Sequence, residues 1–247
     1  MNNLITPTWP APPHIKAYQT TRQGGVSRAP YESLNLGAHV GDDLQAVHAN
    51  RRLLQDHLAL PSSPRWLNQV HGTACVDATT YDGQSPADAS FTTAPGLVLA
   101  IMTADCLPVL FCDDAGSFVA AAHAGWRGLA AGVLEETVRS MNKAPCELYA
   151  WLGPAIGKRA FEVGDEVRST FLDHDPDCEP CFAPSPQGRW LADLYGLATR
   201  RLEAIGLTRI SGGDHCTFED EERFFSYRRE GQTGRMGTFI WIGAVLP

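Results

Sequence analysis

Residues 96–124, GLVLAIMTADCLPVLFCDDAGSFVAAAHA, form a long apolar segment near the middle of the chain. Its first part, Gly96–Thr103, is almost continuously apolar, which is typical of a strand buried on both faces. Val109–Cys112 and Ser117–His123 also have the composition of strands, and the residues between them, Asp113–Gly116, have that of a hairpin loop. The segment therefore predicts buried strands at the centre of a sheet.

The predicted hairpin brings Cys106 and His123 together. If its loop closes an antiparallel pair, Cys112 faces Ser117 and Cys106 lies directly opposite His123. Side chains that face each other in this way have Cβ atoms roughly 4.5–5.5 Å apart. That separation suits two ligands of one metal ion, or a thiol and its base. Pro108 lies inside this ladder and can force a bulge that shifts the register by one residue.

Helices and further strands are predicted on both sides of this segment. Asp42–Leu60 is predicted as a helix, because Asp42 and Asp43 can cap its start and Pro61 ends it. Other helices are predicted at residues 128–141, 163–172 and 190–205, strands at 66–70, 147–152, 224–228 and 236–242, and a loop at 173–187. Because strands and helices alternate in places and cluster in others, we expect one domain of mixed α+β class over residues 1–247.

Composition narrows the class of protein. With 247 residues, 44% of them apolar and 19% charged, the chain can form a packed core, which argues against a disordered protein or a small disulfide scaffold. A net charge of −8 argues against a nucleic-acid partner. We recognise neither a membrane-spanning stretch nor a secretory signal, and without an export signal the seven cysteines are expected to be thiols or metal ligands. These features predict a cytoplasmic protein that does not bind membranes.

His71 is a third candidate ligand beside Cys106 and His123. It follows a short apolar run and precedes Gly72, which predicts a position at the end of a strand. A His–Cys–His set with an open fourth position is the layout of a catalytic zinc site. The pattern alone also allows a simpler interpretation, in which Cys106 is a small buried residue and both histidines are satisfied core or loop residues.

Two other features carry weaker signals. Arg228, Arg229 and Arg235 flank the predicted C-terminal hairpin, where they can bind a phosphate or merely form a solvated surface. Cys178 and Cys181 form a lone Cys-x-x-Cys motif in a polar segment. It lacks the second pair that a structural zinc site needs, so we assign it no function.

Several blocks of this sequence together resemble the laccase-domain family. Its members are known as multicopper polyphenol oxidoreductases, as purine nucleoside phosphorylases and, in some bacteria, as peptidoglycan editing factors. The blocks that carry the resemblance are Gly24–Ser27, Ser33–Gly37, Asn50-Arg51, Asn68–Gly72, Thr103–Val109, His123–Gly128, Gly153–Gly157, Phe161–Gly164, Phe224–Arg229 and Thr233–Met236. They occur in order from about residue 16 to the end of the chain.

The resemblance implies a fold, a cofactor and a site. The fold is a layered α/β/β/α sandwich with mixed sheets, and the cofactor is a zinc ion held by the catalytic residues His71, Cys106 and His123. Asn35 and Arg51 lie in the N-terminal blocks and are expected near the substrate. Many relatives carry a cysteine where this chain has Ala160, so a general role for that thiol does not extend to this protein.

Three functions follow as hypotheses. The first is a zinc-dependent purine nucleoside phosphorylase, a monomer that acts on adenosine, inosine or guanosine and phosphate, with adenosine deamination as a side activity. The second is a copper-dependent polyphenol oxidase. A multicopper centre needs many histidines, usually in His-x-His pairs, whereas this chain has eight histidines and no such pair, although copper can bind a single site in vitro. The third is a metal-free hydrolase for cell-wall precursors, with Cys106 as nucleophile and His71 or His123 as base.

Overall fold

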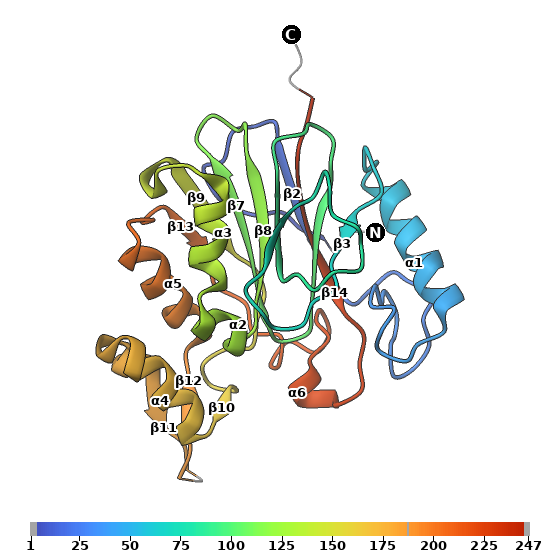
Figure 1. The fold of residues 1–247 in the computed structure, drawn as a ribbon. Coiled ribbons are helices and arrows are strands. Elements are labelled where there is room, and N and C mark those ends of the chain that lie inside the picture. Colours follow the sequence, from blue (N-terminus) through green and yellow to red (C-terminus); the bar gives the residue numbers. More distant parts are fainter. Residues whose placement is uncertain (1–3, 187, 245–247) are drawn as a thin grey trace.

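Two mixed β-sheets stacked face to face form the centre of the molecule in the computed structural model, which describes residues 4–186 and 188–244 (Figure 1). In spatial order, sheet I contains β13 (Ile210–Gly212), β9 (Leu148–Leu152), β7 (Leu107–Asp113), β8 (Val119–Ala124), β5 (Ala89–Thr92) and β4 (Cys75–Asp77). Sheet II contains β1 (Leu4–Ile5), β2 (Ile15–Thr20), β14 (Met236–Ile242), β6 (Leu99–Thr103) and β3 (Arg65–Trp66). A small third sheet contains β10 (Glu162–Val163), β12 (Trp190–Ala192) and β11 (Phe182–Pro184).

Helices cover the outer face of each large sheet. The outer face of sheet I packs against α2 (Trp126–Ala131), α3 (Val133–Met141) and α5 (Leu194–Ala204), whereas α4 (Asp165–His174) packs against the small third sheet. The outer face of sheet II packs against α1 (Leu44–His57). Strand β7 shows how the layers form, because alternate side chains point to opposite faces: Val109 and Phe111 face the helices, whereas Leu110 and Cys112 face sheet II. The layered α/β/β/α fold with mixed sheets is therefore confirmed.

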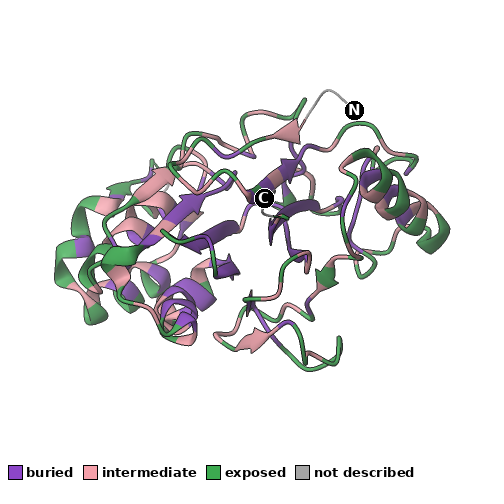
Figure 2. Cartoon of the chain, turned by 90° about the horizontal axis from the view of Figure 1, so that it is seen from above, coloured by how far each residue is buried: buried purple, intermediate pink, exposed green. Residues whose placement is uncertain are grey.

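Burial follows the same layering. In the view of Figure 2, buried residues are concentrated in the strands, whereas the helices carry exposed residues on their outer sides. Strands β6, β7 and β8 consist almost entirely of buried residues, as their continuous apolar sequence predicts. Among the described residues, no helix is both long enough and apolar enough to cross a membrane.

The register of the central hairpin differs from the predicted one. Cys112 pairs with Val119 rather than Ser117, and the residue opposite His123 is Pro108 rather than Cys106. The cause is Asp113, whose carboxylate accepts hydrogen bonds from the backbone N–H groups of residues 117 and 118 and from the Ser117 hydroxyl. These bonds hold residues 117 and 118 in the loop, which moves the pairing by two residues.

Other element boundaries also need correction. The predicted strand at 224–228 is wrong: residues 227–230 form the short helix α6 (Tyr227–Glu230), capped by Ser226, whose hydroxyl accepts from the Arg229 N–H. The predicted helix at 128–141 is split at Gly132, which has a positive φ of 99° and separates α2 from α3. The first residues of the predicted helix at 190–205 form β12, because Asp193 caps α5.

Smaller differences complete the comparison of elements. Of the strand predicted at 66–70, only Trp66 lies in a strand, β3, which begins one residue earlier. The predicted loop at 173–187 contains a short 3₁₀ helix, Pro176–Cys181, and strand β11, and its last residue, Gln187, lies outside the described residues. The strand predicted at 147–152 begins at Leu148 instead, because Glu147 belongs to a second 3₁₀ helix, Pro145–Glu147. The helix predicted at 42–60 is confirmed as α1, with Asp43 as its N-cap.

Candidate metal centre

Three side chains meet at one end of the central hairpin: His71, Cys106 and His123. Cys106 immediately precedes β7, His123 lies near the end of β8, and His71 lies in the loop between β3 and β4. One ligand atom from each lies within 4.8 Å of the other two, and the Cys106 Sγ lies 3.7 Å from the His71 Nε2. The predicted set is therefore brought together in space, even though the predicted hairpin register is wrong by two residues.

The backbone adopts an uncommon conformation at His71 and at the residue that precedes Cys106. His71 itself has φ of 62°, and Asp105, the neighbour of Cys106, has φ of 87°. Residues other than glycine rarely occupy this left-handed region, and they persist there when surrounding contacts hold them. For Asp105 these contacts are hydrogen bonds from the Thr217 hydroxyl, the Ser226 hydroxyl and the Arg228 N–H. Asp105 thereby ties the C-terminal part of the chain to the turn that carries Cys106.

Asp88, which sequence reasoning did not single out, holds the two histidines in place. It lies one residue before β5, where the β5–β8 pairing places it opposite His123, and its side chain is fully buried. The His123 Nδ1 donates to its Oδ1 at 2.8 Å, and the N–H groups of His71 and Gly72 donate to its two oxygens at 2.9 and 2.7 Å. The bond from Nδ1 leaves the His123 Nε2 free as a ligand atom.

Two glycines of the segment 123–128 allow the chain to pass close to the ligands. A Cβ added at Gly125 would lie 2.9 Å from the Cys106 Sγ and 2.8 Å from the His71 Cδ2. A Cβ added at Gly128 would lie 2.8 Å from the Gly72 carbonyl oxygen. A larger residue at either position would therefore collide with the ligands or with the loop that carries His71.

The charges of the cluster favour a thiolate next to an imidazolium when no metal is bound. Burial alone would raise the pKa of Cys106, but the charge and hydrogen bond of His123, together with His71, lower it to about 6. Burial would lower the pKa of His123, but Cys106 and Asp88 raise it to about 9. Burial would raise the pKa of Asp88, but hydrogen bonds from His123 and Gly72 lower it. The cysteine is thus deprotonated near neutral pH, as a metal ligand must be.

The residues present fit a zinc ion. Zn–S and Zn–N bonds of about 2.3 and 2.1 Å at a tetrahedral angle place a sulfur and a nitrogen ligand about 3.6 Å apart, close to the 3.7 Å between Cys106 and His71. His123 is buried, whereas His71 is exposed, so the cluster faces solvent on one side. Three protein ligands with access from one side is the arrangement of a catalytic rather than a structural zinc site.

Arg235 and Arg51 lie near this cluster. Arg235 precedes Met236, which pairs with Thr103 just before the turn that carries Cys106. Burial lowers the pKa of Arg235, and its Nη1 donates to the carbonyl groups of residues 233 and 234. Arg51 extends from α1, lies 4.0 Å above the Trp66 ring and donates from Nε and Nη2 to the Leu36 carbonyl. Burial lowers the pKa of Arg51 to about 10.

The other predicted substrate residues have different surroundings. The Arg229 guanidinium donates to the carbonyl oxygens of residues 217, 218 and 224 and to Glu230, so it ties the C-terminal segment together. Asn35 is fully buried and uses its amide to hold Gly37, Asp42 and the Arg235 N–H. Arg228 is exposed, and its Nη1 donates to the Glu162 carbonyl.

Two more residues near the cluster were missed by the sequence analysis. His39 belongs to the loop that packs on Arg235 through Gly37, and partial desolvation together with the charges of Arg235 and Arg51 lowers its pKa. Tyr227 is 59% exposed and follows Ser226, which is hydrogen-bonded to the Asp105 carboxylate. A lone histidine and a tyrosine within an arginine-rich segment give no signal that separates them from surface residues.

The Cys-x-x-Cys motif lies outside this cluster. Cys178 is buried, and burial raises the pKa of its thiol and raises that of Cys181 to about 11. Both cysteines are free, and at neutral pH both are protonated. The motif therefore lacks the thiolate that nucleophilic chemistry needs.

The fold and the cluster define a layered α/β/β/α protein with a His–Cys–His site of the mononuclear metal type. Residues 16–243 match the sequence model of the family described as "Multi-copper polyphenol oxidoreductase laccase". The chain therefore belongs to this family.

Individual relatives share both the sequence and the fold. The chain is 55% identical to a purine nucleoside phosphorylase of Pseudomonas aeruginosa, over 98% of this chain and 99% of the relative. It is 54% identical to the purine nucleoside phosphorylase YfiH of Escherichia coli, over 98% of this chain and all of the relative. The crystal structure of protein NMB0706 of Neisseria meningitidis superimposes with a TM-score of 0.94 at 50% identity, over 98% of this chain and all of that one.

Proposed function

We propose that the protein is a zinc-dependent purine nucleoside phosphorylase, which converts adenosine, inosine or guanosine and phosphate into the free base and ribose 1-phosphate. The observation that carries the proposal is the convergence of His71, Cys106 and His123 beside Arg235. Relatives at 55% and 54% identity that are named purine nucleoside phosphorylase support the choice of reaction.

The reaction exchanges one bond at the ribose for another. A phosphate oxygen forms a bond to C1′ while the bond from C1′ to the purine nitrogen breaks. The bonding electrons leave with the purine, which takes up a proton, and positive charge builds on the ribose ring in the transition state. The protein must therefore hold a phosphate dianion against C1′ and orient the purine as it departs.

Arg235 is the residue we assign to phosphate. Only its Nη1 donates to protein groups among the described residues, so its Nη2 and Nε are available to an anion next to the metal cluster. Arg51 keeps its Nη1 without a protein partner among the described residues, and its charge, like that of Arg235, lowers the pKa of His39. Because a guanidinium binds phosphate through two parallel hydrogen bonds, Arg235 can also fix the orientation of the nucleophile. Arg229 has no comparable role, since its terminal nitrogens donate to backbone carbonyls and to Glu230.

Tyr227 is the residue we assign to the purine. Its ring is largely exposed, the Arg235 guanidinium lies 5.9 Å from its centre, and the bonds of Ser226 and Arg228 to Asp105 hold the backbone on both sides of it. An exposed aromatic ring fixed next to a site can stack on a planar base. The ring and Arg235 together give the substrate a base contact and a phosphate contact on one side of the cluster.

Zinc, when bound to the cluster, supplies a Lewis acid that can polarise an oxygen of the substrate or of water. The chain's own contribution is to orient the histidine ligands and to keep the cysteine ligand deprotonated. Asp88 orients His123 through the bond to its Nδ1, and the thiolate of Cys106 follows from its lowered pKa. Because attack at the purine C6 needs an activated water, such a Lewis acid would also support adenosine deamination as a second activity.

The same lowered pKa of Cys106 favours the metal-free thiol hydrolase as an alternative. Copper is the other alternative, because a His–Cys–His set binds copper(II) more tightly than zinc in general. We further propose that the protein acts as a monomer in the cytoplasm on small molecules rather than on nucleic acid. Seven free thiols support a reducing compartment, and the net charge of −8 supports the choice of partner.

The test compares products formed from inosine and from adenosine with and without phosphate, on protein purified without added metal and before and after chelation. The proposal predicts free base and ribose 1-phosphate only when phosphate is present, with loss of activity after chelation and recovery with zinc. Inosine formed from adenosine without phosphate would establish the deaminase activity. Nucleoside cleavage that survives chelation but is lost on alkylation would favour a metal-free thiol mechanism. Copper-dependent oxidation of a polyphenol without cleavage of nucleosides would favour the oxidase.

A further inference from the structure

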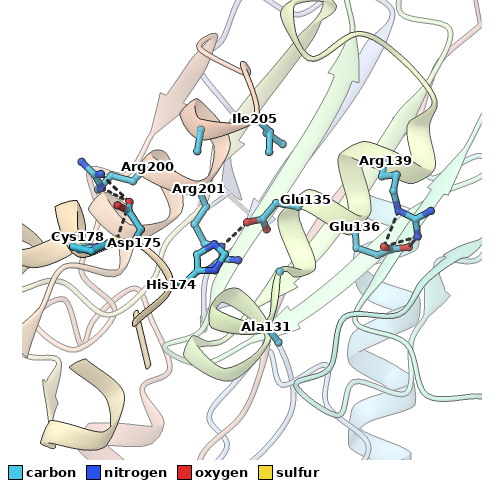
Figure 3. A pocket seen from close by; sticks show the side chains of 13 residues that line it. Ala131, Glu135, Glu136, Arg139, His174, Asp175, Cys178, Arg200, Arg201 and Ile205 are labelled. Atoms are coloured by element: carbon cyan, nitrogen blue, oxygen red, sulfur yellow. Dashed lines mark hydrogen bonds and ion pairs between the residues drawn. The ribbon is translucent and has the colours of Figure 1, made fainter. Parts of the chain in front are cut away.

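A pocket of about 650 Å³ lies on the helical side of sheet I (Figure 3). It is lined by the end of α2, the start of α3, the end of α4 with the residues that follow it, and the end of α5. His71, Cys106 and His123 do not belong to its lining. Helix α2 runs between the two regions, because it begins just after His123 and its last residue, Ala131, lines the pocket. The pocket is therefore a separate site from the metal cluster.

Two charged groups in this pocket are only partly satisfied. The Arg201 side chain is 7% exposed, and its Nε donates to the Glu135 Oε1 at 2.6 Å. The terminal nitrogens of Arg201 donate to no other residue in the described part of the chain. The Glu135 Oε2 is buried and has no hydrogen-bond partner. Figure 3 shows Arg201 reaching from α5 toward Glu135 on α3. Because an unpaired buried polar atom is costly, the Glu135 carboxylate has hydrogen-bonding capacity that the protein itself leaves unused.

Gly132 lies beside both groups. It separates α2 from α3 with a φ of 99°, which strongly favours glycine. A Cβ at this position would lie 3.6 Å from the Arg201 Nη2 and 3.7 Å from the Glu135 Oε2. The Arg201 nitrogen and the Glu135 oxygen thus both lie at van der Waals distance from the position of that Cβ.

The remaining charges of the pocket are paired with each other. Arg139 bonds to Glu136, and Arg200 bonds to Asp175, so the lining as a whole is close to electrically neutral (Figure 3). Ala204 and Ile205 add an apolar wall. A multiply charged anion would gain little from this balance. A ligand that carries one positive and one negative group close together would complement the Arg201 and Glu135 side chains.

We propose that this pocket binds the zwitterionic head group of a free α-amino acid with an apolar side chain. Its carboxylate accepts hydrogen bonds from the terminal nitrogens of Arg201, and its ammonium group donates to the Glu135 carboxylate, whose side chain is 27% exposed. Its side chain lies against Ala204 and Ile205. A cavity of this volume is within the range of small-molecule sites and holds an amino acid with room for solvent.

The test is a calorimetric titration of the full-length protein with L-leucine as the probe, and with L-methionine and L-phenylalanine as alternative side chains. N-acetyl-L-leucine lacks the ammonium group, and L-leucinamide lacks the carboxylate. At least one of the three amino acids is expected to bind with one site per chain. Each derivative of leucine is expected to bind at least about tenfold more weakly than leucine, because each loses one charge-assisted hydrogen bond.

Two variants locate the binding in the pocket. Glu135→Gln keeps the shape of the side chain but removes its charge, and it should weaken binding about tenfold or more. Ala204→Trp fills the pocket from an exposed position on α5, so it should abolish binding without loss of folding, while Ala204→Ser serves as its matched control. Should the glutamate variant fail to fold, the Ala204 pair still decides the question.

Three results would overturn the proposal. One is the absence of binding by any of the three amino acids up to about 10 mM, a concentration above the range of weak specific affinities. Another is equal binding of the two derivatives and of leucine, and the third is binding that Ala204→Trp leaves unchanged. Because binding is measured directly, these results do not depend on whether the protein is a phosphorylase.

Discussion

Replacement of Asp88 by asparagine tests how the protein prepares its metal cluster. The carboxylate of Asp88 receives hydrogen bonds from the His123 ring at 2.8 Å and from the backbone N–H groups of residues 70, 71 and 72 at 3.1, 2.9 and 2.7 Å. An asparagine side chain has one oxygen, so its NH₂ group must face at least one of these donors. The negative charge that holds the His123 proton on Nδ1 is also lost.

The magnitude follows from these contacts. Hydrogen bonds to a charged group contribute about 1.5–3 kcal/mol each, and loss of a carboxylate that orients a histidine ligand lowers metal affinity about 10- to 100-fold. We therefore expect Asp88→Asn to weaken zinc binding by at least about tenfold, equivalent to about 1.4 kcal/mol. The free energy of unfolding of the metal-free protein should also fall, by about 2 kcal/mol or more.

The assay is competition for zinc between the protein and a chromophoric chelator, with thermal unfolding of the metal-free protein measured in parallel. Asp173→Asn, which changes an exposed carboxylate on α4, is the matched control and should leave both quantities unchanged. If Asp88→Asn bound zinc as tightly as the unmodified protein, Asp88 would have no part in orienting the ligands. If stability fell while zinc affinity held, its role would be structural only.

Three further predictions concern the residues around the cluster. Arg235→Gln should raise the KM for phosphate much more than the KM for the nucleoside. The comparison variant Arg229→Gln should mainly lower the midpoint of thermal unfolding. Equal effects of Arg235→Gln on both KM values would count against a phosphate role for Arg235. Gly125→Ala should lower zinc affinity at least about tenfold, since its Cβ would lie 2.9 Å from the Cys106 Sγ, and unchanged affinity in chelator competition would contradict this explanation. In the metal-free protein, iodoacetamide should modify Cys106 at a rate that is constant above its pKa of about 6 and falls below it, while bound zinc protects the thiol. Mass spectrometry should find slow reaction at Cys181 and Cys75, whose pKa values are raised to about 11, and a rate at Cys106 that still increases between pH 7 and 9 would refute the thiolate.

The metal ligands could be predicted from the sequence even though the predicted hairpin register was wrong. Cys106 precedes one strand of the hairpin and His123 ends the other, so both lie at the same edge of the sheet whether the strands pair as expected or two residues further along. The register error came from the side chain of Asp113. Its carboxylate accepts hydrogen bonds from the N–H groups of residues 117 and 118 and so keeps them in the loop, an interaction that the composition of the loop does not reveal. The central strands β6, β7 and β8 could be predicted from their continuous apolar sequence, because both faces of each strand are buried.

Other parts of the site depend on contacts between distant segments, and these have no local sequence signal. Asp88 is separated from His123 by 35 residues and becomes its partner only when β5 pairs with β8. Arg229 and Arg235 look equivalent in the sequence, but the first is bound to backbone carbonyls and the second keeps free donors near Cys106. The strand expected at 224–228 does not form, and residues 227–230 are helical instead. Hydrogen bonds from Ser226 and Arg228 to the distant Asp105 fix the backbone there, and no local pattern predicts them.

The most direct test of the metal-dependent function is the zinc content of the purified protein measured together with phosphorolysis of inosine, for the unmodified chain and for Cys106→Ser. About one zinc per chain is predicted for the unmodified protein, together with phosphate-dependent release of hypoxanthine. In the variant both should be lost, because a serine hydroxyl is a far weaker zinc ligand than a thiolate. A variant that retained full zinc occupancy and activity, or an unmodified protein that catalysed phosphorolysis without bound metal, would contradict the assignment of His71, Cys106 and His123 as a catalytic zinc site.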